Sequence, residues 1–149
     1  MSQRLADLGI ALPPPTAPIA SYAAARRSGG LLYVSGHLAK RDGRVVTGRV
    51  GADVDVDTAR ALARQVALDL IATAAEAVGG VDGLAGVVKL LGLVRSAPDF
   101  DQQPAVMNGA SELLVEIFGD AGRHARSAIG VSELPLRAAL EIEAIFELG

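Results

Sequence analysis

The last residues of the chain alternate between two chemical classes, and this alternation constrains the fold more than any other feature. An apolar set and an acidic set interleave: Leu140, Ile142, Ala144 and Phe146 with Glu141, Glu143 and Glu147. Because successive side chains of a β-strand point to opposite faces, residues 138–148 are expected to form a strand with one buried and one polar face. The sheet that contains this strand therefore needs helices on one side.

Two segments have the periodicity of such helices. Apolar residues recur at helical spacing in 58–80, where Asp57 is expected to cap the helix and Gly79 and Gly80 to end it. A second helix is expected within 97–119, with Asp101 as its cap and Gly119 as its stop. Both helices carry an apolar stripe that can cover one face of a sheet.

The remaining segments read as strands. Turn signals at 28–30 and 42–43 divide residues 21–50 into two consecutive hairpins, which gives three antiparallel strands. Residues 87–94 are apolar on both faces, which is typical of a central strand buried on two sides, and 126–131 is a further strand. The predicted order is βββ-α-β-α-ββ, an α+β fold with a mixed sheet and both helices on one face. Since the other face is also apolar, we expect a homo-oligomer whose sheets pack together.

Length and composition narrow the class of protein. The 149 residues fit one domain, which we divide into a Pro-rich N-terminal arm (1–20) and a single folded unit (21–149). The chain has no cysteine and a net charge of −3 without a basic block, which excludes disulfides and argues against nucleic-acid and anionic-membrane partners. With neither a signal peptide nor an apolar run near the roughly 20 residues of a membrane helix, we expect a soluble cytoplasmic protein.

Cofactor and metal motifs are missing from the sequence. It contains no G-x-G-x-x-G, P-loop or H-E-x-x-H pattern, and His37 and His124 lie too far apart for a metal-ligand motif. We therefore expect no cofactor and no metal.

Six polar side chains remain as candidates for chemistry. They are Tyr22, Ser35, His37, Asn108, Arg126 and Glu141. Taken singly, each has an ordinary interpretation: a surface hydroxyl, a strand bulge, a solvent-facing histidine, an exposed amide, a paired arginine and a solvent-facing acid. Arg126 is the most informative, because a guanidinium in a β-prone segment either lies at the solvated edge of the strand or awaits an anion.

The joint pattern of these residues resembles the Rid/YjgF family, the reactive intermediate deaminases, also labelled endoribonuclease L-PSP. The matching stretches are 34–37 (VSGH), 124–127 (HARS), 134–135 (LP) and 141–145 (EIEAI), in the family's order and spacing. The resemblance runs from about Ser21 to Glu147. Three positions depart from the family pattern: His37 replaces a glutamine, His124 a proline and Ala128 a cysteine.

The resemblance implies a chorismate-mutase-like fold assembled as a homotrimer with clefts between subunits. It also implies hydrolysis of 2-imino and enamine carboxylates, such as 2-aminoacrylate, to a 2-keto acid and ammonia. Arg126 would anchor the substrate carboxylate through two charge-assisted bonds, and Glu141 would orient water and carry a proton. Tyr22, Ser35, Asn108 and the backbone at Ala128 would shape the pocket. For His37, two interpretations stay open: a group that titrates within the pocket, or a cap on its strand.

Two other functions are compatible with the same residues. A non-catalytic module could bind a small carboxylate metabolite in the same cleft, and the loss of the glutamine and cysteine favours this reading. RNA cleavage is disfavoured by the acidic charge balance and the lack of a basic, aromatic surface.

Overall fold

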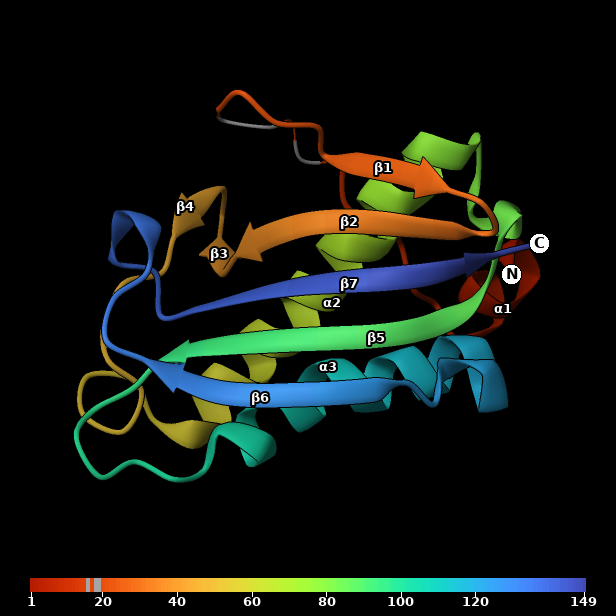
Figure 1. The fold of residues 1–149 in the computed structure, drawn as a ribbon. Coiled ribbons are helices and arrows are strands. Elements are labelled where there is room, and N and C mark those ends of the chain that lie inside the picture. The colour runs from red at the N-terminus through yellow and green to blue at the C-terminus, as the bar shows by residue number, and fades with distance from the viewer. Residues whose placement is uncertain (16, 18–19) are drawn as a thin grey trace.

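The computed structural model describes residues 1–15, 17 and 20–149 and contains a mixed sheet backed by helices (Figure 1). The helices are α1 (Ser2–Asp7), α2 (Val56–Val78) and α3 (Gln103–Phe118). The strands are β1 (Ala25–Ser28), β2 (Leu31–Leu38), β3 (Lys40–Arg41), β4 (Arg44–Val45), β5 (Leu84–Arg95), β6 (Ala125–Val131) and β7 (Leu140–Leu148). The five-stranded sheet has the order β1-β2-β7-β5-β6, in which only β5 and β6 run parallel.

A single apolar layer joins the sheet to the helices, which all lie behind it in Figure 1. The alternation in β7 works as predicted, because its four apolar residues are buried among α2, α3 and the neighbouring strands. The mixed α+β architecture with the long helices on one face is therefore confirmed. No helix in the part of the chain described here is long and apolar enough to cross a membrane.

The second predicted hairpin does not extend the main sheet. Its turn at Asp42-Gly43 is present, with φ of 52° and 75°, but its strands β3 and β4 form a separate two-stranded sheet. The prediction of three consecutive strands in one sheet is wrong for a physical reason. Both edges of β2 are already occupied, by β1 on one side and β7 on the other.

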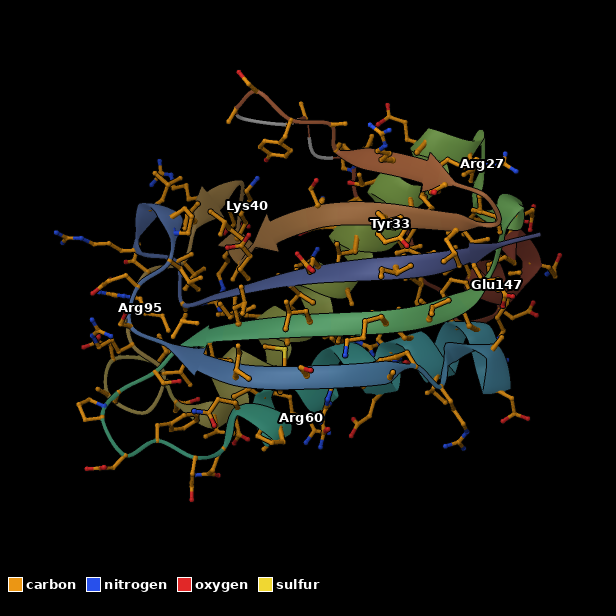
Figure 2. The ribbon with its side chains drawn as sticks, in the orientation of Figure 1. Arg27, Tyr33, Lys40, Arg60, Arg95 and Glu147 are labelled. Carbon is orange, nitrogen blue, oxygen red and sulfur yellow. The ribbon has the colours of Figure 1, made fainter. Side chains whose placement is uncertain are left out.

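The predicted strand over 87–94 is longer in the structure and is buried on one face only. Leu90 and Val94 are fully buried against the helices, whereas Leu91 and Leu93 on the other face are half-buried and Val88 is exposed. The prediction of burial on two sides therefore does not hold within one chain. The open face of the sheet is also where Tyr33 is exposed (Figure 2).

The helix caps differ from those expected. Asp55, rather than Asp57, caps α2, because its side chain accepts a 2.7 Å hydrogen bond from the backbone N–H of Thr58. Gly79 ends this helix at a φ of 80°, as predicted. In α3 the cap residue is Gln102 instead of Asp101, without a side-chain cap bond.

The N-terminal segment packs on its own chain. Leu5 of α1 is buried in the common core, and the N-terminal amine binds the carboxylate of Asp82 at 2.6 Å. The guanidinium of Arg4 donates to the backbone oxygen of Glu116 in α3. The first residues are thus attached to the same core as the rest, while the proposed division at residue 20 stays a prediction.

Helices α2 and α3 approach each other closely at a glycine. A Cβ placed on Gly109 would lie 2.0 Å from the backbone oxygen of Arg60. Ion pairs flank this contact, from Arg60 to Glu112 at 2.5 Å and from Arg64 to Glu116 at 3.0 Å. The position of α3, and of the polar residues that it carries, therefore depends on Gly109.

We expect Gly109→Ala to lower the free energy of unfolding by about 1–3 kcal/mol, because the added methyl group must push two packed helices apart. This loss should outweigh the roughly 1 kcal/mol that alanine gains over glycine in helix propensity. Urea denaturation measures the change. Gly30→Ala, where a Cβ meets nothing within 4 Å, is the control and should be nearly neutral. Equal stability of Gly109→Ala and wild type would contradict the proposed close contact.

Candidate functional site

Arg126 lies on β6, the edge strand next to β5, with its side chain on the same face as α3. Its Nη1 donates to Asn108 Oδ1 at 2.9 Å and to Ser111 Oγ at 3.0 Å. Within residues 1–15, 17 and 20–149, no carboxylate lies within 4 Å of this guanidinium, and its Nε and Nη2 make no hydrogen bond. Two neutral acceptors thus hold one end of a half-buried cation and leave the other end available to an anion.

The structure places Asn108 and Ala128 beside Arg126 and adds a residue that the sequence analysis missed. Ala128 follows two positions along β6, half-buried against the core. The missed residue is Ser111, which lies one helical turn after Asn108 on the same side of α3. The sequence indicates this residue only through the i, i+3 spacing of two polar residues, Asn108 and Ser111, beside the apolar stripe of the helix.

A second group of predicted residues lines a cavity near the opposite edge of the sheet, by β1 and β2. Tyr22, Ser35 and His37 line a space of about 200 Å³ near the end of β2. The Ser35 hydroxyl donates to the backbone oxygen of Ala23 at 2.7 Å. The pairing of β2 with β7 is irregular between Val34 and His37, so the Ser35-Gly36 step forms a bulge.

Two charged residues that were not predicted also line this cavity. Lys40 lies in β3, just beyond the end of β2, and far from Glu147 near the end of β7 (Figure 2). Asp69 comes from α2 and is half-buried, and this burial raises the pKa of its carboxyl. The polar character of the cavity therefore comes from helix α2 as well as from the strands.

His37 is a buried histidine whose ring nitrogens are both satisfied. Its Nδ1 lies 2.7 Å from the backbone oxygen of Ser35, and its Nε2 lies 2.8 Å from Thr73 Oγ1 on α2. A carbonyl oxygen only accepts, so Nδ1 carries the proton and Nε2 accepts from the threonine hydroxyl. Burial lowers the pKa of the ring. His37 thus connects the end of β2 to α2 as a neutral group, rather than facing solvent.

Glu141 lies on the open face of β7, between the fully buried Leu140 and Ile142. Its carboxylate rests against Gly36, where an added Cβ would lie 2.0 Å from Glu141 Oε1. Burial and, to a lesser extent, the charge of Glu143 raise the pKa of Glu141. In the described part of the chain this carboxylate has no hydrogen-bond or ion-pair partner.

The two predicted catalytic residues do not meet within one chain. Arg126 is level with Leu90 and Ala144 across the sheet, whereas Glu141 lies three residues before Ala144 in β7. Two strand spacings and three residue rises separate their Cα atoms by about 14 Å, and their side chains lie on opposite faces. The chain therefore presents two incomplete groups: Arg126 with Asn108 and Ser111, and Glu141 with Gly36.

Metal ligands do not gather in this arrangement. Among the residues whose placement is described, no three histidine or acidic side chains are grouped closely enough to hold an ion.

Comparison with known proteins gives a consistent picture. Residues 2–148 match the family model described as "YjgF/chorismate mutase-like, putative endoribonuclease". Protein TCP17 of Trypanosoma cruzi is 43% identical over 150 residues, covering 99% of this chain and 94% of the relative. The crystal structure of Atu1372, a protein of unknown function from Agrobacterium tumefaciens, is 43% identical with a TM-score of 0.88, covering 99% of this chain and 91% of that one. RidA from an Antarctic Psychrobacter is 29% identical with a TM-score of 0.58, covering 91% and 94%.

We expect the lowered pKa of His37 to make the protein less stable in mild acid. The unfolded ring binds a proton near pH 6.5, whereas the folded ring does so only at lower pH. The free energy of unfolding should therefore fall as the pH drops below about 6.5. Urea denaturation at pH 7.5 and 5.5 measures this, and His37→Gln should show a smaller difference than wild type. An equal difference in both proteins would show that His37 does not titrate abnormally.

Proposed function

Since the chain belongs to the YjgF/chorismate mutase-like family, we propose that it hydrolyses small 2-imino and enamine carboxylates to 2-keto acids and ammonia. The family match supports a small-molecule deaminase or binding role in general. The specific reaction rests on the chemistry of Arg126 and Glu141.

The unpaired end of Arg126 is the observation that carries this proposal. A half-buried guanidinium costs free energy unless a partner compensates its charge, and its neighbours Asn108 and Ser111 are neutral. Because Nη1 is already occupied, Nε and Nη2 form the fork that remains, and this fork matches the two oxygens of a carboxylate. A small carboxylate substrate would supply the missing charge.

A neighbouring copy of the chain would supply the missing acid. In a cyclic trimer the interface joins different surfaces of adjacent subunits, so the Arg126 group of one protomer would face Glu141 of the partner subunit. Among the described residues, none covers the open face of the sheet or pairs with the outer edge of β6, which supports such an assembly. Each trimer would then contain three equivalent clefts.

The reaction needs one water molecule and one proton carrier. With the carboxylate held by Arg126, water adds to the carbon of the protonated imine while Glu141 accepts one of its protons, which gives a neutral carbinolamine. Glu141 then returns this proton to the nitrogen, and as ammonia leaves, Glu141 takes the proton of the remaining hydroxyl, which becomes the keto oxygen. Burial raises the pKa of the Glu141 carboxyl and so brings it closer to the working pH. A carboxyl of this kind can both accept and return a proton.

We expect Arg126→Lys to raise KM for a 2-imino acid roughly tenfold or more, because lysine replaces a two-point contact with a single point charge. Release of ammonia and keto acid from enzymatically generated 2-imino acids of several side-chain lengths measures the rate. Arg64→Lys, an exposed arginine paired with Glu116, is the control and should keep wild-type kinetics. Absence of turnover above the spontaneous rate for all substrates, together with Arg126-dependent binding of pyruvate, would instead identify a carboxylate-binding module.

We expect subunit mixing to reveal whether the cleft is shared. Arg126→Ala and Glu141→Ala should each be inactive alone. Co-expressed in equal amounts, they should recover about one quarter of wild-type activity, since that fraction of randomly formed interfaces pairs an intact arginine with an intact glutamate. The oligomeric mass of every sample is checked by light scattering. Recovery of no activity from mixed trimers of correct mass would contradict a site built from two protomers.

A further inference from the structure

We propose that His124 is a positioning residue that orients the guanidinium of Arg126 through the hydroxyl of Ser111. The proposal rests on the proposed function for its kinetic consequences, but its structural content concerns only this chain. His124 occupies the position where the family pattern described above has proline.

The three side chains form a continuous series of hydrogen bonds. His124 Nδ1 lies 2.7 Å from the backbone oxygen of Gly122, and His124 Nε2 lies 3.0 Å from Ser111 Oγ. Ser111 Oγ in turn lies 3.0 Å from Arg126 Nη1. His124, Ser111 and Arg126 also line one shallow depression at the edge of the sheet.

The chemistry of the end groups fixes the direction of each bond. The oxygen of Gly122 only accepts, so Nδ1 of His124 carries the ring proton. The neutral Nε2 is then an acceptor, and the Ser111 hydroxyl donates its single hydrogen to it. This turns a lone pair of Ser111 toward Arg126, which donates to it. Without the His124 acceptor, the hydroxyl hydrogen could point at the guanidinium and repel it.

The surroundings keep the series in place. A Cβ on Gly122 would lie 2.3 Å from the backbone oxygen of Leu114, so the turn before His124 is pressed against α3. The carbonyl that receives the Nδ1 proton is therefore fixed relative to Ser111. Burial and the nearby charge of Arg126 both lower the pKa of His124, which keeps Nε2 free to accept at neutral pH.

Two substitutions separate positioning from simple anchoring. His124→Asn can keep the bond to Gly122 but loses the contact with Ser111, whereas His124→Gln can keep an acceptor near Ser111 but loses the bond to Gly122. If His124 positions Arg126, the asparagine variant should raise KM roughly three- to tenfold with little change in kcat, while the glutamine variant stays within about twofold of wild type. If His124 serves only to hold the turn at Gly122, the glutamine variant should instead have the larger rise in KM.

A double-mutant cycle tests the path through Ser111. In a Ser111→Ala background, His124→Asn should cause no additional rise in KM, because the link is already broken. Additive effects would overturn the proposal. All variants are compared only after thermal unfolding and oligomeric mass agree with wild type.

A spectroscopic measurement keeps the inference independent of turnover. Nitrogen-15 NMR at pH 7.5 should show His124 protonated at Nδ1 and unprotonated at Nε2, with the Nε2 signal shifting in Ser111→Ala. The opposite tautomer, or an Nε2 signal indifferent to Ser111, would overturn the positioning role even in an active enzyme. The expected tautomer in a protein without turnover would uphold the hydrogen-bond series and refute only the proposed reaction.

Discussion

The apolar layer between the sheet and helices α2 and α3 determines where every candidate functional side chain lies. Because side chains alternate along a strand, burial of Leu140 and Ile142 forces Glu141 onto the open face. A slip of one residue would bury the acid and expose the core, so this placement is strongly specified. Arg126, on the helix side of the edge strand β6, is fixed by the same rule. The separation of the two residues therefore follows from folding itself.

That separation leaves each half electrostatically incomplete. Arg126 is a half-buried cation with neutral partners, and Glu141 is a half-buried acid that accepts no hydrogen bond in the described part of the chain. Ionised groups in such surroundings are poorly stabilised unless opposite charge approaches. Association of two copies around a carboxylate substrate would bring opposite charge to Arg126 and a hydrogen-bond donor to Glu141, and so would stabilise both groups. On this proposal, assembly and substrate binding stabilise the same charges, which couples oligomer formation to activity.

Local patterns in the sequence were sufficient for the strands and helices but not for their partners. The alternation in β7, the helical stripes and the Asp42-Gly43 turn depend on residues close in sequence, and the structure confirms them. The second hairpin was placed wrongly because the edge it needed is taken by β7, about 100 residues later in the chain. Ser111 was missed for a similar reason. Its role appears only when α3 packs behind β6, which requires Gly109 at the contact with α2.

The two histidines that depart from the family pattern have different consequences. Both rings are neutral and hold a backbone carbonyl through Nδ1, but they differ at Nε2. In His37 this atom binds Thr73 within the core, which leaves the ring no free group for a ligand. In His124 the Nε2 atom accepts a hydrogen bond from the Ser111 hydroxyl, which also contacts Arg126. A change at His37 should therefore alter stability and the shape of the cavity, whereas a change at His124 should alter how firmly a carboxylate is held. In the cavity lined by Tyr22, Ser35 and His37, selectivity for the side chain of a substrate would then depend on Asp69 and Lys40 rather than on the imidazole of His37.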